Sequence, residues 1–177
     1  MYGNANYVIF PVEQGLIFWY TEISKPETEM VRTMSTAIVY YSTHHGNTKK
    51  LLDALPKDVV LIDAANPSTT DLSAFDRVGF ASGIYAGAFA RQVMNFAAQY
   101  LPERKPVFFV ATAAMKLKNH FTGITHACEK KRAILLGNYI CQGYNTYGPF
   151  KLVGGTSKGH PTQEDIDGFL AFYNGLR

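Results

Sequence analysis

Side chains suited to binding a phosphate group gather in residues 40–48, whose sequence is YYSTHHGNT. They follow the apolar stretch 37–39 and precede a helix-like segment. A helix leaves its first N–H groups without intrahelical partners, and its dipole places about half a positive charge there. Hydroxyl groups add further donors, and a glycine lets the backbone approach an anion closely. The pattern therefore predicts that residues 42–48 bind a phosphate group.

The loop lacks the two commonest nucleotide-binding signatures. The chain contains no glycine-rich run that ends in Lys-Ser or Lys-Thr, which excludes a Walker loop. It contains no G-x-G-x-x-G, which excludes a dinucleotide fingerprint. The pattern that remains is S-x-x-x-G-x-T, from Ser42 to Thr48. The alternative for this segment is an ordinary polar turn in which Thr48 caps the following helix.

Two further loops follow other apolar stretches and complete the candidate site. Residues 82–87 (SGIYAG) contain two glycines around an apolar and an aromatic side chain, and residues 112–115 (TAAM) are mostly small. Backbone polar groups of the first loop can meet the edge of a flat ring, while Tyr85 covers one ring face. Small residues in the second loop let the other face approach the backbone. Each loop is also compatible with a generic turn.

Strands alternate with helices from residue 36 onward. Strands are predicted at 36–41, 59–62, 78–81, 107–110 and 138–141. The first predicted helix comprises residues 47–55. A second helix presents one apolar face, made of Phe89, Val93, Phe96, Ala97 and Tyr100, and a third is marked by Phe121, Ile124, Cys128 and Leu135. The last helix starts at Pro161 and Thr162, has a capping box to Asp165, and presents Ile166, Phe169, Leu170 and Tyr173. Gly168 in this last helix is expected to cost about 1 kcal/mol relative to alanine.

This alternation predicts an α/β fold, a three-layer sandwich around a five-stranded parallel sheet in the order 2-1-3-4-5. Ligands of such sheets bind beyond the carboxyl ends of the strands, where the strand order reverses. That point lies between strands one and three. The loops after Tyr41 and Ala81 are therefore expected to matter most.

Composition limits the other functional classes. The chain has 177 residues, a formal net charge of +3 and 47% hydrophobic residues. Its cations are scattered, which disfavours nucleic-acid binding. No run of 18 apolar residues predicts a membrane span, and the stretch 7–20 lacks the basic start of a signal peptide, so we expect a cytoplasmic protein. Cys128 and Cys141 form no C-x-x-C motif and are expected in the core; no H-x-x-x-H pair predicts a metal site.

Residues 1–33 form an N-terminal extension with no clean period, and residues 24–29 have the composition of a linker. We hypothesise that the domain comprises residues 34–177 and that translation begins at Met34, so that the extension is absent from the natural protein or is disordered. The alternative is a short strand or hairpin that packs residues 18–20 on a sheet edge. Intact-mass measurement of the natural protein distinguishes these possibilities.

Residues 35–176 resemble the flavodoxin family in its short form, without an insertion in the fifth strand. The resemblance rests on the loop 42–48, which is also similar to that of flavodoxin-like protoporphyrinogen oxidases, and on residues 75–85. Residues 141–150, together with Gly154-Gly155 and residues 158–161, are similar to a bacterial subgroup of flavodoxin family proteins. This resemblance implies the cofactor FMN.

The resemblance also implies which residues contact each part of FMN. The FMN phosphate is expected at Ser42, Thr43, His44, His45, Gly46, Asn47 and Thr48. The isoalloxazine is expected at Ser82, Gly83, Ile84, Tyr85, Ala86 and Gly87, with Thr112, Ala113, Ala114 and Met115 on its other side. We hypothesise that His44 or His45 helps to neutralise the phosphate, because histidine gains charge near neutral pH. The alternative is that both side chains point to solvent.

Three functions follow from these expectations. The first is an FMN-binding redox protein that carries electrons between partner proteins. The second is a flavin-dependent oxidoreductase that acts on a small substrate of the quinone or protoporphyrinogen type. The third is a flavin-free binding module that retains only the fold. Carriers with basic partners gain from an acidic face, so the net positive charge fits a standard acidic carrier less well. No catalytic acid–base pair stands out in the loops.

Overall fold

The computed structural model describes residues 34–66, 71–146, 152 and 154–176. The chain divides into two units, residues 1–33 and residues 34–177, and the described residues all belong to the second. The predictions made for residues 1–33 therefore lie outside the described residues.

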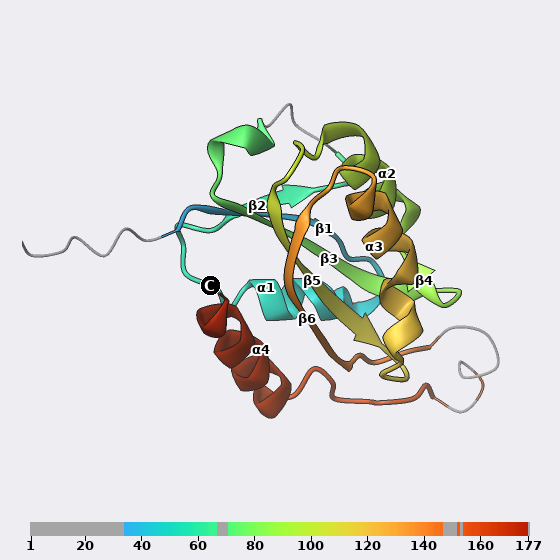
Figure 1. The fold of residues 1–177 in the computed structure, drawn as a ribbon. Coiled ribbons are helices and arrows are strands. Elements are labelled where there is room, and N and C mark those ends of the chain that lie inside the picture. Colours follow the sequence, from blue (N-terminus) through green and yellow to red (C-terminus); the bar gives the residue numbers. More distant parts are fainter. Residues whose placement is uncertain (1–33, 67–70, 147–151, 153, 177) are drawn as a thin grey trace, which may run out of the picture. The chain divides into compact units, whose positions relative to one another are not determined.

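Five parallel strands form the sheet of this unit, in the order β2-β1-β3-β5-β6 (Figure 1). The strands are β1 (Thr36–Tyr41), β2 (Val60–Asp63), β3 (Arg77–Tyr85), β5 (Pro106–Ala113) and β6 (Ile134–Gln142). Counted along the chain without β4, this is the predicted order 2-1-3-4-5. The predicted fold class is thus confirmed, with the strand order reversing between β1 and β3 as expected.

A sixth, two-residue strand was not predicted. In the structure β3 continues beyond Ala81 to Tyr85, turns at Ala86 and Gly87, and pairs antiparallel with β4 (Ala88–Phe89). Both turn residues have positive φ, 48° and 86°, which closes a tight hairpin. The predicted loop 82–87 is therefore mostly strand. Phe89, expected on a helix face, is instead buried from this short strand.

The helices are α1 (Asn47–Leu52), α2 (Arg91–Tyr100), α3 (Thr122–Glu129) and α4 (Gln163–Gly175). Two predictions about their faces were wrong. Leu135 belongs to β6, because the chain leaves α3 through Arg132 in a left-handed conformation. Tyr100 ends α2 with 49% of its surface exposed, although Val93 and Phe96 are buried as expected.

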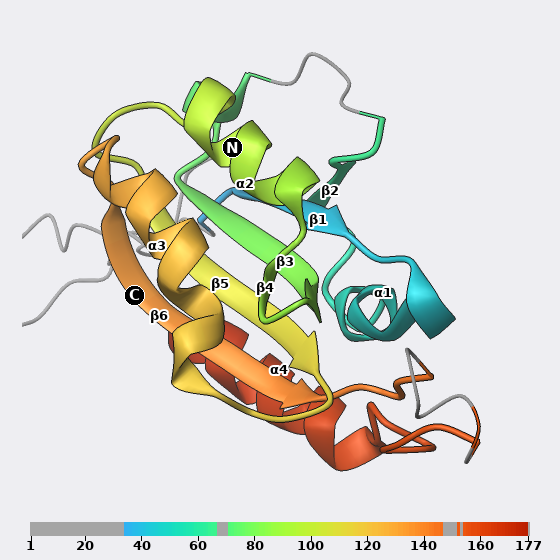
Figure 2. The ribbon, with the colours of Figure 1, turned by 90° about the vertical axis from the view of Figure 1, so that its right-hand side faces the viewer.

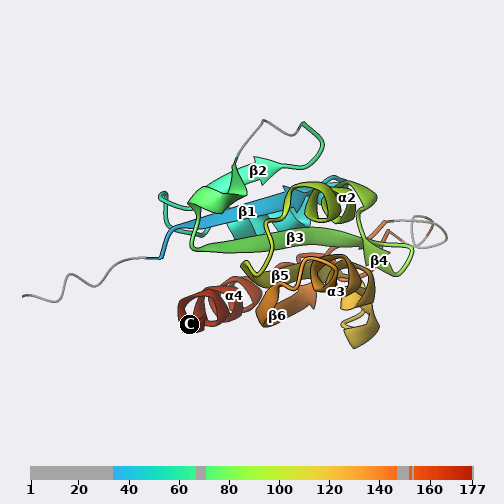
Figure 3. The same ribbon diagram turned by 45° about the horizontal axis from the view of Figure 1, so that its top comes forward.

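Two apolar layers hold the helices on opposite faces of the sheet, α2 and α3 on one and α1 and α4 on the other (Figures 2 and 3). Successive residues of the central strands alternate between these layers. Val39 and Phe109 pack with α2 and α3, whereas Ile38 and Phe108 pack with α1 and α4. Because both faces are covered, the central strands β1, β3 and β5 are buried over most of their length, which explains their largely continuous hydrophobic sequences.

Both cysteines are buried free thiols, as predicted. Burial raises the pKa of Cys128 and the pKa of Cys141 to about 12 each, so both remain protonated at neutral pH. Within the described ranges, no group of three His, Cys, Asp or Glu side chains is arranged to hold a metal ion. None of the helices in these ranges has the length and apolar character needed to cross a membrane.

The capping box predicted at the start of α4 is present. Thr162 Oγ1 accepts a hydrogen bond from Asp165 N at 3.3 Å, and the Asp165 carboxylate accepts one from Thr162 N at 2.9 Å. Gly168 has a packing reason that the sequence did not reveal, because a Cβ there would lie 3.1 Å from the hydroxyl of Tyr139. That hydroxyl donates to the Asp165 carbonyl at 2.6 Å.

Removing the Asp165 charge is expected to destabilise the domain most at neutral pH. Burial by itself would raise the pKa of Asp165, but hydrogen bonds from the Thr162 N–H, His160 and the Thr162 hydroxyl outweigh it and lower the pKa. A lowered folded-state pKa means that the stabilisation is present above the unfolded-state value and is lost as pH falls through the folded-state value. We expect Asp165→Asn to cost about 1–2 kcal/mol at pH 7.

Urea unfolding of both proteins at neutral and acidic pH checks this expectation. The difference between Asp165→Asn and the native chain should shrink once the pH falls below the ordinary aspartate pKa of about 4. Asp167→Asn is the matched control, because Asp167 is exposed and, among the described residues, accepts a hydrogen bond only from Gln163 Nε2 of its own helix. An equal destabilisation by Asp165→Asn at both pH values would show that its charge is not what stabilises the helix start.

Candidate functional site

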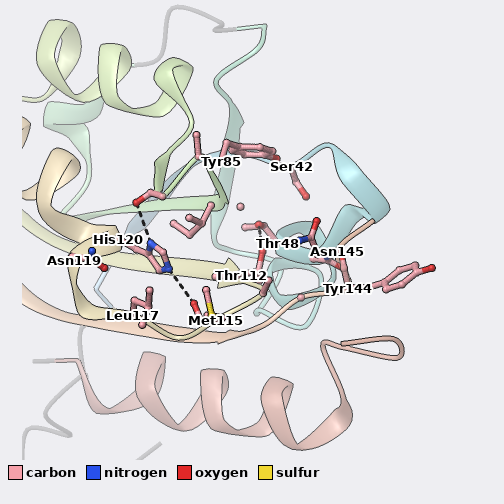
Figure 4. A pocket seen from close by; sticks show the side chains of 18 residues that line it. Ser42, Thr48, Tyr85, Thr112, Met115, Leu117, Asn119, His120, Tyr144 and Asn145 are labelled. Atoms are coloured by element: carbon pink, nitrogen blue, oxygen red, sulfur yellow. Dashed lines mark hydrogen bonds between the residues drawn. The ribbon is translucent and has the colours of Figure 1, made fainter. Parts of the chain in front are cut away.

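A cavity of about 560 Å³ opens at the carboxyl ends of β1, β3, β5 and β6 (Figure 4). All three predicted loops contribute to it. Of the 17 residues predicted to contact a cofactor, twelve line the cavity: Ser42, Asn47, Thr48, Gly83, Ile84, Tyr85, Ala86, Gly87, Thr112, Ala113, Ala114 and Met115. The structure thus brings together three segments that span 73 positions of the sequence, from Ser42 to Met115.

Of the other predicted residues, Thr43, His45, Gly46 and Ser82 are not among the residues that line the cavity. Ser82 is fully buried. Its hydroxyl donates to the Gly83 carbonyl at 2.5 Å and accepts from Ala90 N at 2.9 Å. Ser82 therefore holds the β3–β4 hairpin against the start of α2 and does not point into the cavity.

His45 is turned toward the segment that follows β6. It has a φ of 60°, its Nε2 lies 2.9 Å from Thr146 Oγ1, and its ring centroid lies 4.3 Å from that of Tyr144. Gly46 has a positive φ of 65°, and its N–H donates to the Thr43 carbonyl. These two residues shape the turn from β1 into α1. The side chain of His44 lies outside the described part of the chain.

Hydrogen bonds of its side chains fix the loop 42–48, the predicted phosphate loop. Ser42 Oγ accepts from Lys49 N at 3.2 Å, which gives one N–H of the first turn of α1 a partner. Thr48 Oγ1 lies 2.9 Å from Thr112 Oγ1, and both threonines are nearly fully buried. This pair of hydroxyls joins α1 to β5 at the inner end of the cavity.

Asn47 has an unused acceptor at the cavity. Its Nδ2 donates to the Tyr144 carbonyl at 2.8 Å, but its buried Oδ1 accepts no hydrogen bond from any described residue. An unsatisfied buried acceptor costs about 1–3 kcal/mol. A ligand hydroxyl or N–H in this cavity would relieve that cost, so Asn47 fits a polar ligand beside the phosphate loop.

Tyr85 connects β3 to the phosphate loop. Its hydroxyl lies 2.8 Å from Thr43 Oγ1, and its ring meets Tyr41 edge-on with centroids 5.9 Å apart. A Cβ at Gly83 would lie 3.0 Å from the Tyr85 hydroxyl, so this position favours glycine. The ring stands at one wall of the cavity (Figure 4).

Six further residues line the cavity but were not among the predicted contacts: Leu117, Asn119, His120, Gly143, Tyr144 and Asn145. Three of them precede α3, and three follow β6. The aromatic ring of Tyr144 suits a pocket wall and ordinary packing equally, so its residue type does not single it out. Gly143 directly follows the last strand, and that position could have suggested a place in the site. Its contact with Asn47, however, depends on tertiary structure.

His120 joins two of the loops. Its Nδ1 lies 3.0 Å from the Gly87 carbonyl and its Nε2 lies 3.0 Å from the Met115 carbonyl. A neutral imidazole carries one N–H and donates to only one of these oxygens, whereas the imidazolium donates to both. The side chain is buried, so it clamps the β3–β4 turn to the segment after β5.

Removing this clamp is expected to loosen both loops. His120→Ala should lower the stability by about 2 kcal/mol, since it removes the buried ring that bridges the Gly87 and Met115 carbonyls. For a domain of this size that corresponds to a fall of about 4–8 °C in Tm. Thermal unfolding checks the size of the effect, and amide hydrogen exchange over residues 115–121 checks its location. The exposed His126 provides the matched control, and equal behaviour of the two alanine variants would contradict the clamp.

Comparison with known proteins supports the same architecture. The family model described as "Flavodoxin domain" matches residues 38–135. An uncharacterised protein of Methanocaldococcus jannaschii is 36% identical over 139 residues, which cover 75% of this chain and 91% of that protein.

Among solved structures, a short-chain flavodoxin associated with a bacterial microcompartment is similar with a TM-score of 0.57 and 18% identity, over 81% of this chain and 97% of that one. General stress protein 14 of Treponema denticola, solved in complex with FMN, is similar with a TM-score of 0.57 and 11% identity, over 81% and 99%. These two likenesses concern the fold. The family model and the archaeal relative carry the assignment, and the chain belongs to the flavodoxin family.

Proposed function

We propose that this protein binds FMN in the cavity at the carboxyl ends of β1, β3 and β5 and carries electrons between redox partner proteins. The observation that carries the proposal is the cavity itself. In a chain of the flavodoxin family, it lies where the strand order reverses, and it is lined by the three loops expected to contact a flavin. FMN is the cofactor of this function, and the similar T. denticola protein was solved with FMN.

The lining residues fit the two ends of this cofactor. Hydroxyl and amide groups of Ser42, Asn47 and Thr48 stand at the end where a phosphate and ribityl chain belong, and the unused Asn47 Oδ1 accepts from a ribityl hydroxyl. Apolar Ile84 and Met115 stand where a ring system belongs. When bound, FMN supplies the one- and two-electron chemistry, while the protein binds, orients and shields it.

Electron carriage is favoured over catalysis by the side chains around the cavity. The described lining residues include no carboxylate, and their single imidazole, His120, has both nitrogens at backbone carbonyls. Proton transfer to a substrate needs a general acid or base within hydrogen-bond reach. A carrier needs no such group, because it transfers electrons alone.

Stepwise anaerobic reduction of the FMN-loaded protein tests this proposal. We expect a yellow protein that takes up electrons in two separable one-electron steps and turns over slowly with NAD(P)H and a quinone. Rapid two-electron turnover with those reagents would contradict the carrier and support an oxidoreductase acting on a small substrate. A colourless protein that ignores added FMN would contradict both.

A further inference from the structure

The four segments that surround the cavity contain no acidic residue. Residues 36–52, 77–102, 104–128 and 130–163 have neither aspartate nor glutamate, and every lining residue falls within them. Within the part of the chain that the structure describes, the carboxylates at the same edge of the sheet are Asp63 at the end of the outer strand β2 and those at the start of α4. The mouth of the cavity is therefore free of negative side chains over all its described residues.

One part of this mouth combines exposed apolar and basic side chains. We call residues 115–118, with the sequence MKLK, the basic rim. Met115 is 66% exposed and Leu117 is 43% exposed although both line the cavity. Lys116 and Lys118 are exposed between and beside them, and neither forms an ion pair with a described residue.

The backbone of the basic rim is held in place. Leu117 N donates to the Met115 carbonyl at 3.2 Å, and His120 N donates to the Leu117 carbonyl at 3.3 Å. The buried His120 ring holds the Met115 carbonyl from the inside. A partner that docks here meets a surface that is already ordered, which lowers the entropy lost on binding.

We propose that the basic rim is the docking surface for an acidic redox partner protein. This inference rests on the proposed function, since it places the partner beside the flavin. An apolar centre flanked by charge is the usual anatomy of an interface, and exposed lysines that form no ion pair with a described residue steer a negatively charged partner toward the cavity mouth. Asp63, Glu164 and Asp167 lie outside the residues that line the cavity, and the Asp165 carboxylate faces His160.

Electron transfer from the reduced, FMN-loaded chain to two protein probes of opposite charge tests the proposal. Acidic plastocyanin and basic cytochrome c are both one-electron acceptors. We expect the stopped-flow rate with plastocyanin to fall at least about tenfold between roughly 10 mM and 300 mM salt, as screening removes the steering. The rate with cytochrome c should stay level or rise over the same range.

Charge reversal locates the effect. Lys116→Glu combined with Lys118→Glu should lower the low-salt rate with plastocyanin by about fivefold or more and raise the rate with cytochrome c. The matched control reverses two lysines that are exposed at the opposite ends of the strands, Lys57 before β2 and Lys130 before β6, and should change both rates less than twofold.

Three results would overturn the proposal. The first is a faster reaction with cytochrome c at low salt in the native chain. The second is an equal effect of the two double variants. The third is binding of the protein to phosphatidylserine vesicles that requires Lys116 and Lys118, which would assign the rim to a membrane surface. A spectrum recorded before each run shows whether FMN is bound. A failure to bind FMN, which contradicts both the proposed function and this inference, is thereby distinguished from a failure of docking alone.

Discussion

Ser42→Asp is expected to weaken FMN binding at least about a hundredfold without harming the fold. The aspartate carboxylate is a hydrogen-bond acceptor, so it can keep the bond that Ser42 Oγ accepts from Lys49 N. This carboxylate, however, stands where the FMN phosphate belongs. Two charges a few ångströms apart near a protein surface repel by roughly 3 kcal/mol, which is about a hundredfold in affinity.

Two controls isolate the charge. The Ser42→Asn side chain has nearly the same shape as that of Ser42→Asp and its amide oxygen also accepts hydrogen bonds, but it carries no charge, so its affinity should stay within about tenfold of the native chain. Riboflavin has no phosphate and should bind the native and Ser42→Asp chains equally. Fluorescence titration of both flavins against the three proteins measures these effects. A Ser42→Asp chain that binds FMN normally would place the phosphate away from residues 42–48.

Gly79→Ala is expected to be the most damaging single-methyl change in the sheet. A Cβ at Gly79 would lie 2.5 Å from Phe108 Cζ and 3.0 Å from Ile38 Cγ1, and both of those residues are fully buried. The Phe108 ring cannot easily move away from the added methyl group, because it packs against the rings of Phe172 and Tyr173. Overpacking of this kind costs about 1–3 kcal/mol, and we expect the upper end.

A smaller residue at position 108 should relieve the clash. Gly79→Ala should cost much less in a Phe108→Leu background than in the native chain, which urea unfolding of the two single variants and the double variant measures. A Cβ added at Gly175, which ends α4, would have no neighbouring atom within 4 Å, so Gly175→Ala should change stability by less than about 1 kcal/mol. Additive costs at positions 79 and 108 would contradict the contact.

The fold could be predicted largely because its signals are local. Each central strand is a continuous apolar run, which is expected when helices cover both faces of a parallel sheet. The capping box of Thr162 and Asp165 depends on residues three positions apart and was visible in the sequence. The short strand β4 was not predicted, because its two residues, Ala88 and Phe89, are too few to show an alternating pattern.

The lining of the cavity was most predictable where it follows directly from a strand. Residues 83–87 and 112–115 line the cavity because the carboxyl ends of parallel strands meet at one edge. His120 was missed because its role exists only once Gly87, 33 residues away, is brought beside it. Likewise the contact between Asn47 and Tyr144 spans 97 residues, and no sequence period connects them.

Ser82 and His45 were predicted to contact the cofactor but do not line the cavity. Both carry side chains that suit a ligand, and both lie in segments that reach the site. The alternation of β3 instead directs the Ser82 hydroxyl to Ala90 N, and the left-handed conformation of His45 directs its ring to Tyr144. Residue type alone predicts which groups can bind a cofactor, whereas the backbone decides which of them face it.

Titration of FMN into the flavin-free protein, followed by the quenching of flavin fluorescence, tests the central claim most directly. The structure predicts saturation at one FMN per chain with a Kd below about 1 µM, or a binding free energy beyond roughly −8 kcal/mol. Fluorescence that stays unquenched at a large excess of protein, with no saturable binding, would contradict the assignment of this cavity to FMN.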